Sequence, residues 1–193
     1  MDYEYDVFFS YKRDDESDKW HRTLMEKLTF WLKLELSNPD VAVFIDIDDV
    51  RTGAIWRNKL AHALRVSKTM VCVWSPLYFQ SAWCVSEWKT FAERESRFKL
   101  DLVAPASYHD GACFPHEAKA KQMIDLSNFT SISTRFWDTE LAVEFDTKCL
   151  KPFAKDIAAL VRMAPPFDPD FPFVEVQQLD LPPSPVIGRI ARV

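Results

Sequence analysis

Trp83 and Glu87 stand four residues apart in the segment SAWCVSEW (residues 81–88), which follows an apolar run that ends at Trp74. On a helix, residues four positions apart share a face, so the indole of Trp83 would lie beside the carboxylate of Glu87. A carboxylate beside an indole can be the reactive end of a pocket. The same pair also suits an ordinary helix surface, so the rest of the chain must decide between the two.

Cysteine and metal chemistry are weaker alternatives. The four cysteines are far apart and form no C-x-x-C pair: Cys72, Cys84, Cys113 and Cys149. This spacing predicts neither a zinc site nor a disulfide framework, and a reduced, intracellular protein is the simplest interpretation. Cys84 has no histidine near it in the sequence to activate it as a nucleophile. The acids Asp46, Asp48 and Asp49 lack the spacing of a calcium loop, so no metal site is expected.

The composition excludes several further classes. The chain has 193 residues, of which 48% are hydrophobic, and this suits one globular domain with an extension. The net charge is -5 without a dense run of Lys and Arg, which argues against a nucleic-acid partner. Three glycines are too few for a P-loop or a G-x-G-x-x-G fingerprint. The charged start and the absence of a long apolar run predict no signal peptide and no membrane span, hence a cytoplasmic protein.

Short apolar runs alternate with longer amphipathic segments along the chain. Strands are expected at residues 5–10, 41–46, 69–74, 102–107 and 129–134, the last at an edge of the sheet. Helices are expected at residues 17–36, 56–66, 83–98, 116–124 and 141–163. This alternation predicts an α/β, flavodoxin-like, doubly wound sheet of five parallel strands in the order 2-1-3-4-5 over residues 1–163. Residues 164–193 are expected to form a proline-rich extension.

A ligand crevice is expected where the strand order reverses, beyond the carboxyl ends of the first and third strands. A phosphate-accepting receiver domain would need acids at these strand ends, but the chain has Ser10 and Ser75 there. Glu87 is the candidate catalytic residue near this crevice. The candidate ligand-binding residues are Ser10, Tyr11, Asp46, Arg51, Trp56, Ser75 and Trp83. Five of them have a structural alternative: Ser10 could cap a strand end, Asp46 and Arg51 could form a solvated pair, and Trp56 and Trp83 could belong to the core.

Four segments resemble the Toll/interleukin-1 receptor (TIR) domain family. YDVFFSYKRDD resembles box 1, VFIDIDDVRTGAIW resembles box 2, SPLYFQSAWCVSEW resembles the segment with the W-x-x-x-E motif, and LVAPASYHDG resembles the fourth strand and its loop. The resemblance spans residues 3–163 and is closer to bacterial members than to animal receptors. Thr52 departs from the family, because many relatives have proline before the glycine of box 2.

The resemblance implies one of two functions. Some TIR domains cleave NAD+ between nicotinamide and ribose with the glutamate of W-x-x-x-E, which is Glu87 here. Such an enzyme would be an NAD+ nucleosidase or cyclase that uses NAD+ as substrate and needs no other cofactor. In bacteria it would act in anti-phage defence, by depleting NAD+ or by making a signal for a downstream effector protein. The alternative is a non-enzymatic module that binds other TIR domains through residues 46–56, and self-association is expected in both cases.

Overall fold

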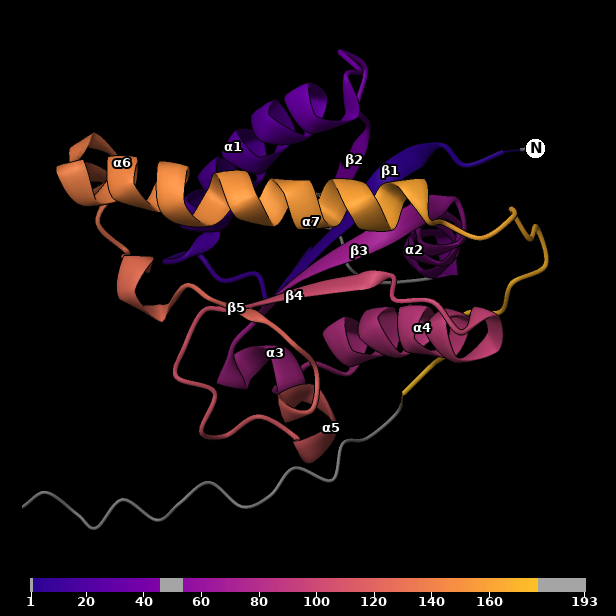
Figure 1. The fold of residues 1–193 in the computed structure, drawn as a ribbon. Coiled ribbons are helices and arrows are strands. Elements are labelled where there is room, and N and C mark those ends of the chain that lie inside the picture. The colour runs from indigo at the N-terminus through magenta and orange to yellow at the C-terminus, as the bar shows by residue number, and fades with distance from the viewer. Residues whose placement is uncertain (1, 46–53, 177–193) are drawn as a thin grey trace, which may run out of the picture.

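The computed structural model describes residues 2–45 and 54–176, which build one parallel sheet with helices on both faces (Figure 1). The strands are β1 (Tyr5–Tyr11), β2 (Val43–Ile45), β3 (Ser67–Trp74), β4 (Val103–Ser107) and β5 (Ile124–Asp125). Neighbouring strands are all parallel and their order is β2-β1-β3-β4-β5. The fold class expected from the sequence is therefore confirmed.

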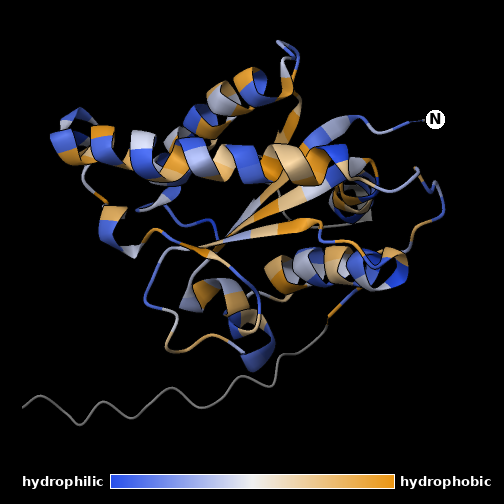
Figure 2. Ribbon diagram, viewed as in Figure 1, coloured by the Kyte–Doolittle hydropathy of each residue, from blue (hydrophilic) through white to orange (hydrophobic). Residues whose placement is uncertain are grey.

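Two layers of helices enclose the sheet. One layer contains α1 (Asp18–Leu36) and α7 (Lys151–Arg162), and the other contains α2 (Ala54–Arg65), α3 (Pro76–Gln80), α4 (Ala82–Phe98) and the short α5 (His116–Lys119). Apolar colour runs along the central strands, whereas it alternates with polar colour around each helix (Figure 2). That contrast is typical of parallel strands that are buried on both faces.

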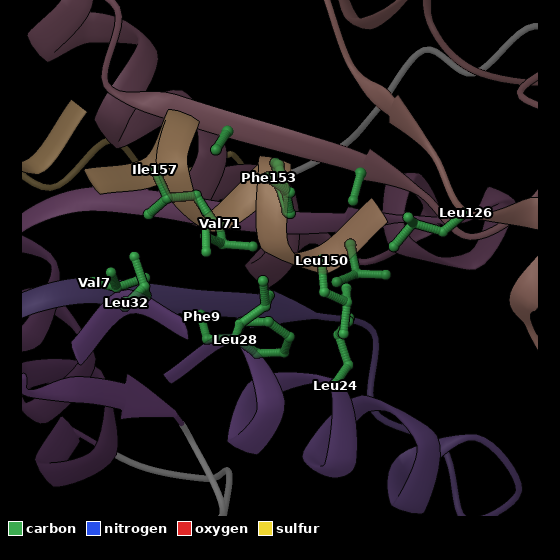
Figure 3. Close-up of a cluster of buried hydrophobic side chains, with 14 of the residues drawn as sticks. Val7, Phe9, Leu24, Leu28, Leu32, Val71, Leu126, Leu150, Phe153 and Ile157 are labelled. Atoms are coloured by element: carbon green, nitrogen blue, oxygen red, sulfur yellow. The ribbon is translucent and has the colours of Figure 1, made fainter. Parts of the chain in front are cut away.

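Alternation along β1 decides which layer each of its side chains meets. Val7 and Phe9 pack with Leu28 of α1 and Phe153 of α7 in one core cluster (Figure 3). Phe8 points to the opposite face and packs in the second cluster, against α2 and α4. Ser10 lies two positions after Phe8, so its side chain meets the α2 and α4 layer as well.

The fifth strand lies earlier in the chain than the predicted residues 129–134. β5 consists of Ile124 and Asp125, which pair with Ala106 and Ser107 of β4. The chain then turns away, because the Asp125 carboxylate accepts the backbone N–H of Ser127 at 2.9 Å. Residues 127–138 contain two 3-10 turns, Ser127–Phe129 and Thr134–Asp138. The prediction was wrong because neither apolar residue of residues 129–134 joins the sheet: Phe129 stacks on a core ring at 4.9 Å, and Ile132 is 69% exposed.

The closing helix expected at residues 141–163 is present at residues 140–162, but it is not α-helical throughout. It consists of α6 (Glu140–Phe145), a π-helical turn (Asp146–Leu150) and α7. Pro152 stands in the first turn of α7 and has no N–H for a regular helical bond to the preceding turn. The side chain of Asp146 accepts the indole N–H of Trp31 at 2.8 Å, which joins the π-helical turn to α1.

Two further features were not expected in this form. The short helix α3 begins with Ser75 as its cap and Pro76 in its first turn, an arrangement that favours helix initiation. Residues 164–176, called the C-terminal segment below, have no regular secondary structure and pack against α4. The extended, proline-rich character was predicted, but the surface that it covers was not.

Candidate active site

A chain of hydrogen bonds joins β1, α3 and the second turn of α4. Ser10 Oγ donates to Glu87 Oε2 at 2.5 Å and lies 2.9 Å from the hydroxyl of Tyr78. Because the Ser10 proton is used on the carboxylate, the Tyr78 hydroxyl donates to Ser10. Burial raises the pKa of Tyr78 well above its usual value, which keeps this donor protonated. The short bond from Ser10 therefore fixes the position of the Glu87 carboxyl group.

Glu87 is only 7% exposed, and it borders a small cavity at the carboxyl end of β1. The cavity, called the Glu87 cavity below, has a volume of about 20 Å³. Its walls are residues of β1, the start of α2 and the first turns of α4: Phe8, Phe9, Ser10, Tyr11, Trp56, Trp83, Cys84 and Glu87. That space holds about one water molecule. The carboxylate therefore lies in a nearly dry, largely aromatic environment.

Trp83 and Glu87 share the face of α4 that borders this cavity, as the spacing predicted. The helix begins at Ser81, whose side chain accepts the backbone N–H of Cys84 at 3.4 Å. The ring of Trp83 meets that of Trp56 edge to face, with centroids 4.5 Å apart. The two indoles thus form one aromatic wall opposite the β1 backbone.

Tyr11 borders the Glu87 cavity, but its ring packs on the other face of the sheet. Its hydroxyl donates to Asp18 at 2.5 Å, and its ring stacks on His21 with centroids 4.5 Å apart. Burial and the Asp18 carboxylate raise the pKa of Tyr11 above its usual value. The part of Tyr11 that meets α4 is its backbone carbonyl, which accepts the thiol of Cys84 at 3.7 Å. A contact from Tyr11 to a ligand near Glu87 would therefore come from its main chain.

Ser75 lies at a different and larger cavity. Its side chain accepts the backbone N–H of Tyr78 at 3.1 Å, which caps α3. The cavity beside it has a volume of about 590 Å³ and is bordered by residues that include Lys12, His21 and Tyr108. Glu87 does not border it. The structure therefore brings Ser10, Trp56, Trp83 and Glu87 together but separates Ser75 from them.

Two candidates, Asp46 and Arg51, lie outside the described residues. One residue with a clear part in the site was missed, namely Tyr78, whose hydroxyl lies 2.9 Å from Ser10. No pattern in the sequence indicates this role, because Tyr78 stands in an apolar run where a buried aromatic ring is the ordinary expectation. Within residues 2–45 and 54–176, no group of three or more potential metal ligands is close enough to hold an ion.

The fold agrees with a comparison of the chain with known families. The family model described as TIR domain matches residues 7–138, so the chain belongs to the TIR domain family. No curated protein sequence matches it. Across the described part of the chain, no helix has the length and apolar character needed to cross a membrane.

Solved structures of similar chains include two TIR domains. One is the TIR domain of the Toll-related receptor TRR-2 from Hydra magnipapillata, with 20% identity, a TM-score of 0.46, and coverage of 72% of this chain and 97% of that chain. The other is from the activated Roq1 resistosome, which directly recognises the pathogen effector XopQ. It has 20% identity, a TM-score of 0.43, and coverage of 80% of this chain and 84% of that chain.

Proposed function

We propose that this chain is an NAD+ nucleosidase or cyclase whose catalytic residue is Glu87. The observation that carries the proposal is a carboxylate that is 7% exposed, held by Ser10 at 2.5 Å, and faced by the indoles of Trp56 and Trp83. Burying a carboxylate among aromatic rings costs folding free energy, and such groups cluster at functional sites.

The proposed reaction needs one carboxylate and no general acid. When the bond between nicotinamide and ribose breaks, its electron pair goes to the ring nitrogen, and the cationic ring leaves as neutral nicotinamide. Positive charge then develops on the ribose, where the Glu87 carboxylate stabilises it. Water or another nucleophile next attacks the same ribose carbon, which gives ADP-ribose or a cyclic or conjugated product. Most glycosidases differ because their leaving oxygen requires protonation by a second carboxyl group.

The surroundings of Glu87 strengthen this electrostatic effect. An indole supplies a flat surface on which a nicotinamide ring can stack, and cationic rings are attracted to aromatic faces. Exclusion of water lowers the local dielectric constant, so a charge on the carboxylate acts more strongly on the reacting ribose. Ser10 and Tyr78 would orient the carboxylate without neutralising it, because both supply uncharged hydroxyl groups.

One observation favours the alternative, a TIR–TIR interaction module without enzymatic activity. The Glu87 cavity has a volume of about 20 Å³, whereas sites for small molecules usually measure about 300–1,000 Å³. An enzyme must therefore enlarge this cavity before NAD+ can enter. A scaffold protein would need no such change and would use its surface to bind other TIR domains.

The two functions are separated by following NAD+ and assembly in the same samples. Purified protein, concentrated or with a crowding agent, is incubated with NAD+, and products are separated by chromatography while light scattering reports assembly. The proposal predicts nicotinamide release by the wild type and none above background by Glu87→Gln. Assembly without nicotinamide release under every condition would favour the scaffold. The second product, linear or cyclic ADP-ribose, shows whether the enzyme depletes NAD+ or makes a signal for an effector.

A further inference from the structure

The C-terminal segment forms a regular set of contacts with α4. The backbone N–H of Val174 donates to Thr90 Oγ1 at 3.0 Å, and the backbone N–H of Val176 donates to Ser86 Oγ at 2.8 Å. Two residues of an extended chain, two positions apart, thus meet two hydroxyls that lie one helical turn apart. The distance between alternate residues of an extended chain and the rise of one helical turn are nearly equal, at about 6–7 Å each. The segment therefore runs antiparallel to α4, toward the helix start where Trp83 lies.

The segment is anchored at its other end by a buried ring. Phe171 is 2% exposed, and its carbonyl accepts the Arg65 side chain at 2.9 Å. The guanidinium of Arg94 lies between two aromatic rings, 4.8 Å from the centre of Phe91 and 4.7 Å from that of Phe171. The segment is thus an integral part of the described fold, and its position beside Trp83 is defined.

A second cavity lies between the segment and the start of α4. It has a volume of about 210 Å³ and is bordered by Ala82, Trp83, Ser86, Glu175 and Val176. Trp83 is the one residue that borders both this cavity and the Glu87 cavity. The half-buried indole therefore lies between a space for one water and a space about ten times larger.

Contacts from the segment and from α2 hold this indole in place. Phe173 stacks on Trp83 with ring centroids 6.5 Å apart. The guanidinium of Arg57 lies 5.7 Å from the centre of the Trp83 ring and forms an ion pair with Glu175 at 3.0 Å. The contacts of Trp83 with Phe173 and Arg57 are loose or solvent-exposed, since the Arg57 and Glu175 side chains are 51% and 41% exposed, so these two contacts fix the indole only weakly. The closer contact is the edge-to-face one with Trp56, at 4.5 Å, on the side of the Glu87 cavity.

The other walls of the Glu87 cavity have less freedom. Phe8, Phe9 and Ser10 belong to the interior strand β1, which pairs on both sides. Cys84 and Glu87 are buried on α4, and close-packed interiors do not yield easily. Trp83 is the described wall residue that also borders the 210 Å³ cavity under the C-terminal segment.

We propose that Trp83 is the movable wall of the Glu87 cavity, and that its indole swings into the 210 Å³ cavity under the C-terminal segment when a ligand enters. The space beneath the segment is then as necessary for ligand entry as the space beside the carboxylate. Trp83 acts as a positioning residue, and residues 173–176 set how easily it moves. The movement of Trp83 does not depend on the proposed reaction. Only the identification of the ligand as NAD+ rests on the proposed function.

Cys84 provides a direct measure of the movement, because it borders the Glu87 cavity and is 4% exposed. Ala82→Leu adds bulk to the 210 Å³ cavity from a helix position, and Ala82→Ser is its small control. We expect alkylation of Cys84 by iodoacetamide, followed by peptide mass spectrometry, to be at least about fivefold slower in Ala82→Leu than in Ala82→Ser. The half-buried Cys113 and Cys149 lie elsewhere and should react at unchanged rates.

Two further variants keep the test decisive. Val176→Phe fills the same cavity from the opposite side and should also slow the alkylation of Cys84, so it replaces Ala82→Leu if that variant folds poorly. Phe173→Ala removes the ring that stacks on Trp83 and should raise the alkylation rate of Cys84 severalfold. Equal Cys84 rates in the filled and control variants would overturn the proposal.

Kinetics with NAD+ separate this inference from the proposed function. If the wild type releases nicotinamide, Ala82→Leu should raise KM several-fold and leave kcat within about twofold, because the closed wall opposes entry and not bond cleavage. A fall in kcat alone would contradict the proposal. If no nicotinamide is released but the alkylation of Cys84 is still slower in Ala82→Leu and Val176→Phe, the proposed reaction is contradicted and the movement of Trp83 is supported.

Discussion

Ser10 and Glu87 lie 77 residues apart in the chain, yet their side chains share a hydrogen bond of 2.5 Å at the carboxyl end of β1. The contact joins the interior strand β1 to α4 through two residues, Ser10 and Glu87, that are 2% and 7% exposed. The site is therefore part of the packed interior, so changes in its polar groups will affect both stability and activity.

Replacing Ser10 should destabilise the fold more than replacing Tyr78, whose hydroxyl lies beside it. Ser10→Ala removes one hydrogen bond from Glu87 and one from the buried Tyr78 hydroxyl, so it should lower the free energy of unfolding by about 2–3 kcal/mol. Tyr78→Phe removes only one of these bonds and leaves Ser10 with its carboxylate partner, at a cost of about 1 kcal/mol. Urea unfolding measures the free energy of unfolding of both variants. A larger loss in Tyr78→Phe would show that the chain of hydrogen bonds is not centred on Ser10.

His21 should make the protein less stable in acid. Burial between aromatic rings lowers its pKa from 6.5 to about 4. Above pH 6.5 neither the folded nor the unfolded state binds a proton here, so the residue contributes nothing to the pH dependence. As the pH falls from 6.5 to 4 only the unfolded chain becomes protonated, so stability decreases, by about 2–3 kcal/mol at pH 4.5. Below pH 4 the loss levels off.

His21→Phe is the matched variant for this effect, because it keeps an aromatic ring in the stack and has no proton to bind. Urea unfolding at pH 7 and at pH 4.5 gives the loss of stability for each protein. The wild type should lose about 2–3 kcal/mol more than the variant over this interval. Equal losses would mean that His21 titrates normally in the folded state.

Arg94→Lys should be damaging although it conserves charge. The guanidinium donates to the carbonyls of Ser67 and Leu64 at 2.8 and 3.1 Å while lying between two aromatic rings, and an ammonium group cannot reproduce this planar geometry. We expect a loss of about 2 kcal/mol or more, measured by urea unfolding, because buried polar groups lose their partners. Arg97→Lys is the control, since that exposed side chain should cost less than about 0.5 kcal/mol. Similar losses would contradict the anchoring role of Arg94.

The sequence predicted those features that depend on local periodicity. The parallel sheet flanked by helices followed from apolar runs that alternate with amphipathic segments, and the shared face of Trp83 and Glu87 followed from their spacing. β5 was misplaced because only two residues pair, and a strand so short leaves no alternating pattern. Contacts across the fold, such as Tyr78 with Ser10 or Val176 with Ser86, depend on how the elements are packed, which no local pattern encodes.

The central claim is that the Glu87 carboxylate stabilises charge during cleavage of NAD+, and matched substitutions on α4 test it most directly. Glu87→Gln keeps the size and hydrogen-bonding capacity of the side chain but removes its charge, whereas Glu93→Gln makes the same change at an exposed position of the helix. With circular dichroism showing that both variants are folded, kcat/KM for nicotinamide release should fall about 100- to 1,000-fold in Glu87→Gln and stay within about twofold in Glu93→Gln. Nicotinamide release by Glu87→Gln at the rate of the wild type would contradict the account.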